Sequence, residues 1–362
     1  MKTGRSLQEL AAEIERQSES KRDLLVNLGA LSMSTDNSGV QLNVDYGGDG
    51  GNKSFQFEQF GMNEIAHRQV GQHLRIPAAY YDRMRTDYPD LLVENVNGWF
   101  SRTPNTSRML RTLDGTARAF LSDRYRRIDN IEVAQTVLPI IANMGGANVE
   151  SCELTDGRMY IKVVNPKIQT EVVKGDVVQS GLIITNSEVG LGSLSVSPLI
   201  FRLVCSNGMI ARDETVRKYH VGRLNETGGD YDIYRNETIE ADDRAYLMKL
   251  EDTVRAAVSE AKFMSIVDRM RETTEAKIEA PAVPKVVELT SKEYDFNEDE
   301  QKGILGHLIA GNDLSLYGLA NAVTRQAQDV ESYDRSTDLE AAGWKIITMA
   351  PSLWKRIAAE SR

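Results

Sequence analysis

Three Asn-Gly or Asp-Gly dipeptides constrain the fold of this chain more than any other feature. Asp114-Gly115, Asp156-Gly157 and Asn207-Gly208 each stand between runs that are typical of β-strands. These dipeptides favour the tight two-residue turns of antiparallel hairpins, so each one predicts a hairpin. We therefore expect hairpin-rich β structure from about residue 105 to 223, with a helix near 131–143 between the first two hairpins.

Helical patterns surround this β region. Apolar residues recur at helical spacing on both sides of it, and two shorter runs alternate apolar and polar residues as strands do. Hairpins mixed with helices predict an α+β fold: an antiparallel hairpin-rich sheet with flanking helices, a long central helix and a small helical C-terminal unit. The expected helices span 6–28, 61–97 with a break at Ile76-Pro77, 237–275, 299–310, 314–328 and 336–349, and the expected strands span 40–46 and 54–60.

The length of 362 residues allows more than one folded unit. We expect an N-terminal helix and hairpin in residues 1–60 and an α+β core domain in 61–278. Prolines and an acidic run predict a linker in 279–300, and a helical C-terminal unit follows in 301–362.

The net charge of −10 argues against nucleic-acid binding if it is read over the whole chain. Its distribution changes that interpretation. From residue 225 onward, 27 acidic residues face 17 basic ones, which accounts for the whole excess. The remainder of the chain is neutral, so a basic surface can exist there.

An arginine cluster is the feature that most clearly suggests a function. Residues 101–128 contain seven arginines and no lysine, opposed only by Asp114 and Asp123. The guanidinium fork matches phosphate oxygens, and aromatic side chains stack on bases, which is what a single-stranded nucleic acid needs. The alternative is that the arginines pair with acidic residues elsewhere, such as those in the C-terminal third. The candidate residues are Arg102, Arg108, Arg111, Arg118, Phe120, Arg124, Tyr125, Arg126 and Arg127.

A second basic group follows the third predicted hairpin. If the hairpins share one sheet, we expect this group to close the same groove over a nucleic acid. Its members are Arg212, Arg217, Lys218, His220 and Arg223.

No pattern indicates a catalytic site, a metal site or a cofactor. Asn186-Ser187-Glu188, Cys205, Asp213 and His220 have the residue types of a nucleophile and a base, but no known motif fixes their geometry. The two cysteines, Cys152 and Cys205, lie in apolar runs and predict buried free thiols rather than a disulfide or zinc site. Without a signal peptide or membrane span in the sequence, we expect a cytoplasmic protein.

Several strings of this sequence resemble a known family. FLSDRYRRIDN (120–130), NSEVGLGSLSV (186–196), LVCSNGM (203–209) and HVGR (220–223) are similar to the phage/plasmid-like protein family, whose shared domain has no known function. The resemblance runs from about residue 60 to 330 and implies an origin in a phage or plasmid. It implies no catalytic residues. In outline, the hairpins, long helix and arginine cluster also resemble single-strand annealing recombinases of the RecT and Redβ kind, which form oligomers with a basic DNA groove.

These observations predict a non-catalytic, oligomeric protein that binds single-stranded DNA in recombination or replication. A second hypothesis is a protein-interaction module that acts on a host or phage factor through the acidic C-terminal third. A third is a nucleic-acid enzyme, for which the sequence offers no compact carboxylate cluster.

Overall fold

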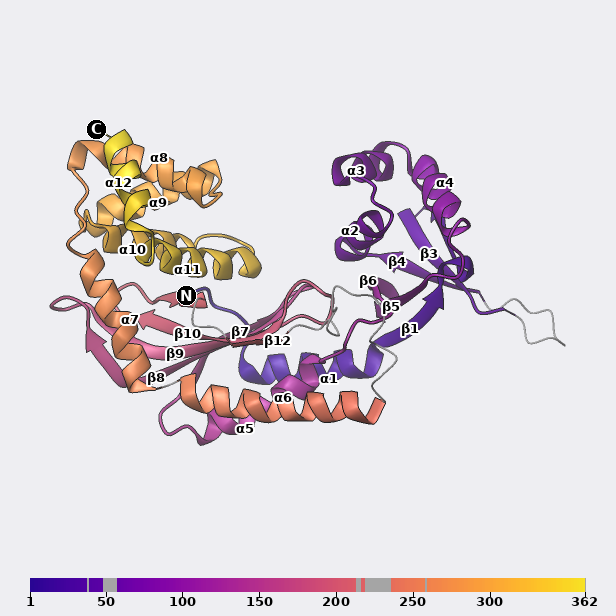
Figure 1. The fold of residues 1–362 in the computed structure, drawn as a ribbon, viewed down its shortest axis with the longest axis horizontal. Coiled ribbons are helices and arrows are strands. Elements are labelled where there is room, and N and C mark those ends of the chain that lie inside the picture. The colour runs from indigo at the N-terminus through magenta and orange to yellow at the C-terminus, as the bar shows by residue number, and fades with distance from the viewer. Residues whose placement is uncertain (38, 48–56, 213–215, 219–235, 258, 362) are drawn as a thin grey trace.

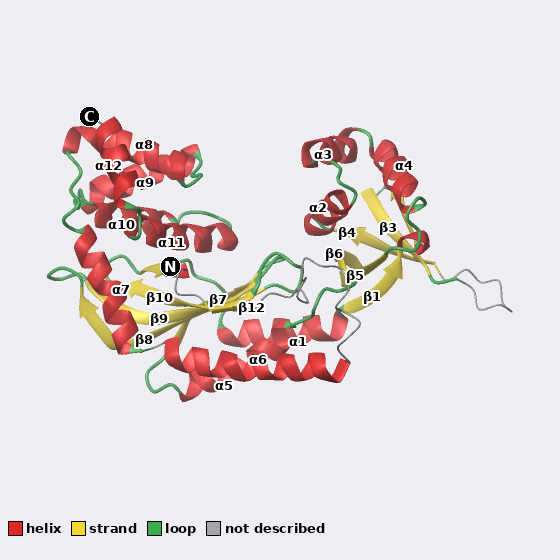
Figure 2. Ribbon diagram, viewed as in Figure 1, coloured by secondary structure: helices red, strands yellow, loops and turns green. Residues whose placement is uncertain are grey.

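The computed structural model describes residues 1–361 except 38, 48–56, 213–215, 219–235 and 258. Its strands form two sheets, each covered by helices, and the fold is α+β as predicted. Figure 1 shows the N-terminal sheet with its helices on the right, and a central sheet with the C-terminal helices on the left. Figure 2 shows the same division, with helices on both sides of the central sheet.

The N-terminal sheet and three helices make up what we call the N-terminal lobe, residues 22–122. The strand order is β1-β5-β6-β4-β3-β2, with β4 and β6 parallel and the other pairs antiparallel. The helices cover one face and bury a core that includes Leu42, Phe60 and Leu110. The elements are β1 (Arg22–Asn27), β2 (Leu31–Asp36), β3 (Gly39–Asp45), β4 (Phe57–Met62), α2 (Glu64–His73), α3 (Ala78–Asp87), α4 (Pro89–Phe100), β5 (Ser107–Leu113) and β6 (Thr116–Ser122).

The edge strand β2 of this sheet is closed by a side chain. The amide of Asn97 on α4 accepts a hydrogen bond from the Met33 N–H at 2.6 Å and donates one to the Met33 carbonyl at 2.9 Å. A single side chain thus replaces the missing neighbour strand at this point, which protects an edge that could otherwise pair with another chain.

The central sheet has the order β11-β10-β9-β8-β7, and β12 also pairs with β10. Helices α1, α5 and α6 cover one face, and the C-terminal helices pack against the other. The strands are β7 (Asn148–Leu154), β8 (Met159–Glu171), β9 (Val177–Asn186), β10 (Leu194–Arg202), β11 (Asn207–Ile210) and β12 (Val216–Lys218). The helices are α1 (Leu7–Ser20), α5 (Asn130–Asn143), α6 (Asn236–Ala257), α7 (Glu260–Thr273), α8 (Val283–Glu293), α9 (Glu298–Gly311), α10 (Leu316–Gln326), α11 (Tyr333–Ile347) and α12 (Pro351–Glu360).

Local signals predicted much of this structure. The Asp114-Gly115 and Asp156-Gly157 turns join β5 to β6 and β7 to β8, as expected. The third hairpin forms, but its turn spans 203–206, because Asn207 and Gly208 already pair with Arg202 and Phe201. The prediction of a turn at Asn207-Gly208 was wrong.

Four other predictions failed, most of them where long-range packing decides the structure. The first helix ends at Ser20 rather than 28, because residues 22–27 pair with β5 and place Leu24 and Val26 against the core of the lobe. The single helix expected over 237–275 is two helices, α6 and α7. The expected linker in 279–300 contains α8, which buries Val286 and Val287. The boundary expected at residue 60 falls inside the N-terminal sheet.

Gly181 on β9 gives a test of the central sheet. A Cβ at this position would lie 2.4 Å from the Val163 carbonyl oxygen of β8, which is backbone and cannot move aside. We expect Gly181→Ala to lower the free energy of unfolding by about 1–3 kcal/mol, the usual cost of overpacking.

The matched control is Gly306→Ala on α9, where an added Cβ meets no atom within 4 Å. This change should raise stability by about 0.5–1 kcal/mol, because alanine favours a helix interior over glycine. Urea denaturation of both variants measures the difference. Equal effects of the two changes would contradict the close approach of β8 and β9.

Candidate nucleic-acid interface

The arginine-dense segment lies where the N-terminal lobe meets the central sheet. The outer face of the β5–β6 hairpin and the loop after it contact the segment 187–191, which connects β9 to β10. Ala119, Leu121 and Val189 share a small buried cluster there. The Tyr125 hydroxyl donates to the Ser187 carbonyl at 3.0 Å, so the loop 123–127 is fixed against the segment. Two of the strings that resemble a known family, 120–130 and 186–196, therefore pack on each other.

Arg111 is fully buried at this junction. Its guanidinium donates to Asp23 at 2.7 Å, to Asp129 at 2.8 Å and to the Glu188 carbonyl at 2.8 Å. Burial opposes the charge, but the hydrogen bonds to Asp23 and the charge of Asp129 outweigh it and raise the pKa of Arg111 above its ordinary value. Arg111 therefore stays charged, and its hydrogen-bond acceptors are protein groups rather than water.

Glu188 forms the second half of this arrangement. Its side chain is 5% exposed and accepts from Arg118 at 2.6 Å, from Lys21 at 3.3 Å and from the Asn130 N–H at 2.7 Å. Lys21 also lies 2.7 Å from Asp129. Burial tends to raise the pKa of Asp129, but Arg111 and Lys21 hold it below its usual value.

We call these groups the junction charge cluster. Three cations balance three carboxylates, and they come from the residue after α1, from β1, β5 and β6, from the residue before α5 and from the β9–β10 segment. The members are Lys21, Asp23, Arg111, Arg118, Asp129 and Glu188.

The cluster corrects part of the predicted nucleic-acid site. Arg111 is 0% and Arg118 7% exposed, and both have carboxylate partners, so neither side chain can reach a phosphate. Phe120 is 1% exposed in the core of the N-terminal lobe, where it cannot stack on a base. The carboxylates that hold these arginines come from residues 23, 129 and 188, not from the acidic C-terminal third.

The other residues of the first group reach the surface to different degrees. Arg102, Arg124 and Arg127 are exposed, and Tyr125 and Arg126 are half-buried. Arg127 pairs with Asp23 at 3.1 Å. Arg108 is also half-buried, with its guanidinium 5.0 Å from the centre of the Phe120 ring. Burial lowers the pKa of Arg108.

The second basic group is only partly described. Arg212 pairs with Asp338 of α11 at 3.0 Å. Arg217 and Lys218 lie in β12, opposite Ser195 and Leu194 of β10. Their side chains lie outside the described part of the chain, as do His220 and Arg223 entirely. The β12 backbone therefore runs beside β10, which begins directly after the segment 187–193.

Another buried ion pair joins the central sheet to the C-terminal helices. Lys162 of β8 and Glu340 of α11 are both fully buried, and Lys162 Nζ lies 2.6 Å from the carboxylate. The same ammonium lies 4.6 Å from the centre of the Tyr333 ring. Sequence reasoning missed this pair, because its members lie in separate elements and no local pattern links them.

Sequence reasoning also missed the exposed aromatic side chains. Among the described residues, the aromatic side chains with large exposed fractions all lie in the N-terminal lobe. Helical spacing could have found those on α3 and α4, because they lie off the buried faces of these helices. They are Tyr46, Phe57, Tyr80, Tyr88 and Trp99.

Asp213 and His220 lie outside the described residues, and the described residues considered for catalysis do not assemble into a reactive site. Ser187 is buried and donates to the Gly157 carbonyl at 2.8 Å, while Glu188 belongs to the junction charge cluster. Cys152 is a buried free thiol, as predicted, but Cys205 lies half-buried in the turn before β11. Within the described residues, no three His, Cys, Asp or Glu side chains could hold a metal ion together. No described helix is both long and apolar enough to cross a membrane.

A family model described as a domain of unknown function, DUF932, matches residues 119–344. The chain belongs to this family. The DUF932 match begins inside β6 and covers the central sheet and most of α11, while β1–β5 and α2–α4 precede it. No curated protein and no solved structure matches the chain.

The junction charge cluster predicts unequal roles for two neighbouring arginines. Arg111→Met should lower the free energy of unfolding by about 3–5 kcal/mol, because it removes the fully buried cation between Asp23 and Asp129 and leaves the Glu188 carbonyl without its donor. Arg127→Met removes an arginine whose side chain is 55% exposed and should cost at most about 1 kcal/mol. Chemical denaturation at neutral pH measures both, and equally small losses would contradict a structural role for Arg111.

Proposed function

We propose that this DUF932 protein binds single-stranded DNA as an oligomer, in the recombination or replication of a phage or plasmid. The observation that carries the proposal is the arginine-rich loop 123–127, held at the junction by the hydrogen bond from Tyr125 to Ser187. A fixed loop presents its cations to a ligand at a low cost in conformational entropy. The similarity of four strings to the phage/plasmid-like family supports a mobile-element origin.

In this proposal the phosphates bind to Arg124, Arg126 and Arg127, and Arg102 extends the basic surface. Arg217 and Lys218 remain candidates for further phosphate contacts, because the β12 backbone pairs with β10 directly after the segment 187–193. Arg111 and Arg118 do not touch DNA, and instead hold the loop in place through the junction charge cluster. The exposed aromatic residues of the N-terminal lobe, rather than Phe120, are the candidates for base stacking.

A salt titration tests the proposal. Anisotropy of a labelled oligothymidine should report binding that weakens steeply between about 50 and 200 mM salt. Replacing Arg124, Arg126 and Arg127 by Gln should weaken binding by roughly tenfold or more, and should reduce the slope of log affinity against log salt by about 2, since each lost phosphate contact removes about 0.7.

The matched control replaces Lys285, Lys292 and Arg356 by Gln, which removes the same charge from exposed positions on α8 and α12. This variant should bind as the parent does. An absence of binding by the assembled protein at 50 mM salt would sink the proposal, and so would an equal loss in the control.

A protein-interaction module is the second candidate function, and one observation favours it. Tyr80, Tyr88, Leu91 and Trp99 expose 40–54% of their surface on and between α3 and α4. Tyrosine and tryptophan dominate the binding energy of protein interfaces. These residues precede the DUF932 match, so a partner bound here would contact the N-terminal lobe and not the domain that defines the family.

The two functions are separable by mutation. If the chain acts on a host or phage protein through this lobe, Tyr88→Ser with Trp99→Ser should abolish crosslinking to that protein in the cell. The loop variant at Arg124, Arg126 and Arg127 should then retain it. The opposite pattern, or a loss caused by changes in the acidic region 285–345 alone, would contradict a partner site on α3 and α4.

A further inference from the structure

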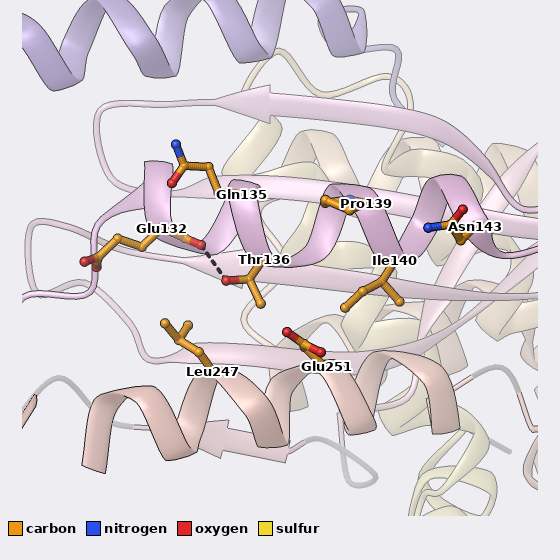
Figure 3. Close-up of a pocket in the computed structure, with 8 residues that line it drawn as sticks. All are labelled: Glu132, Gln135, Thr136, Pro139, Ile140, Asn143, Leu247 and Glu251. Carbon is orange, nitrogen blue, oxygen red and sulfur yellow. Dashed lines mark hydrogen bonds between the residues drawn. The ribbon is translucent and has the colours of Figure 1, made fainter. Parts of the chain in front are cut away.

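A groove between α5 and α6 lies on the face of the central sheet opposite the C-terminal helices. It has a volume of about 510 Å³, which is in the range of ligand sites. Figure 3 shows Glu251 and Leu247 pointing from α6 toward Thr136 and Ile140 of α5. Its lining residues are Glu132, Gln135, Thr136, Pro139, Ile140, Asn143, Leu247 and Glu251.

The groove has an apolar floor and acceptor groups around it. Ile140, Leu247 and Pro139 supply the apolar surface, and Glu251 supplies a carboxylate, while the Glu132 carboxylate points away toward the start of α5. None of its described lining residues is basic. Glu251 accepts no hydrogen bond from any described residue, and Glu132 uses one oxygen to cap α5 through the Asp129 N–H at 3.1 Å.

Pro139 adds an acceptor that does not depend on these carboxylates. It lies inside α5, and proline has no N–H to donate to the carbonyl four residues earlier, which is that of Gln135. The last turn of α5 also contains no basic side chain, so its partial negative charge is not compensated there. A helix that only had to pack on the sheet would gain stability from almost any other residue at position 139.

We propose that this groove binds an alkyl cation: an ammonium or guanidinium group carried on an aliphatic arm. The cationic group contacts Glu251 and the Gln135 carbonyl, and the aliphatic arm lies on Ile140 and Leu247. Such an arm packs on apolar surface while its charged end remains with polar groups. A free polyamine and the arginine side chain of a protein both have this chemistry. The site is separate from the arginine loop proposed to bind DNA.

Titration calorimetry on the full chain tests the proposal with two probes, spermidine and Nα-acetyl-arginine amide, at 150 mM salt. Saturable binding of either probe is expected, whereas 1,4-butanediol and Nα-acetyl-citrulline amide, which lack the charge, should not bind. Tighter binding of spermidine would assign the site to free polyamines, and tighter binding of the arginine amide would assign it to a protein side chain.

Three variants decide whether the groove is responsible. Glu251→Gln should weaken binding about tenfold, the value of one charge-assisted hydrogen bond. Asp252→Asn is the matched control, because Asp252 is the exposed neighbour on α6 and does not line the groove, and it should change affinity less than twofold. Pro139→Ala should weaken binding several-fold while raising the unfolding midpoint, a combination that a purely structural role for this proline would not produce.

Failure to detect saturable binding of either charged probe would overturn the proposal. Equal losses in Glu251→Gln and Asp252→Asn would also overturn it, because they would indicate general surface charge. An unchanged affinity in Pro139→Ala would remove the Gln135 carbonyl from the site and refute the arrangement proposed here.

Discussion

The burial of Arg111 is the constraint on which the arrangement of the two sheets depends. A guanidinium taken out of water costs several kcal/mol unless acceptors surround it, and this chain supplies those acceptors from three separate places. Asp23 comes from β1, Asp129 from the residue before α5 and Glu188 from the β9–β10 segment. Because the ion contacts can be satisfied only when these elements meet, the charges specify how the N-terminal lobe sits on the central sheet.

The same principle holds on the other side of the central sheet. Lys162 and Glu340 are fully buried against each other, and so fix α11 to β8. Asn207 of β11 adds a hydrogen bond from its amide to the Thr324 hydroxyl of α10. Apolar packing provides most of the stability at both junctions, but it tolerates sliding. A paired charge does not, because a small displacement leaves it without a partner.

The sequence allowed accurate predictions where the signal is local. Two Asp-Gly turns, the helical stretch of α2–α4 with its break at Ile76-Pro77, α5 and three of the C-terminal helices follow from turn chemistry and apolar spacing. The second break in that stretch, at Tyr88, was not predicted. Long-range pairing was not predictable in this way. Residues 22–27 look like a continuation of the first helix until β5 offers a partner, and Val286 and Val287 look like part of a linker until the C-terminal helices bury them.

The candidate site shows the same limit. Seven arginines without a lysine predicted phosphate contacts, because the guanidinium fork suits phosphate oxygens. The fork suits carboxylates and carbonyls equally well, and Arg111 uses it for three such acceptors at once. Composition could not separate the arginines that build the junction from those that reach the surface. The separation depends on Asp23 and Glu188, which lie far away in the sequence and had no visible link to the cluster.

The start of the DUF932 match inside β6 has a consequence for how such chains can be inherited. A segment that begins at residue 119 carries Asp129 and Glu188 but leaves behind Arg111, Arg118 and Lys21, the three cations that neutralise them. If the family joins this segment to different N-terminal parts, each of those parts has to deliver its own positive charge to the same buried place. Only N-terminal parts that place cations there would leave both carboxylates paired, so this requirement would restrict which fusions fold stably.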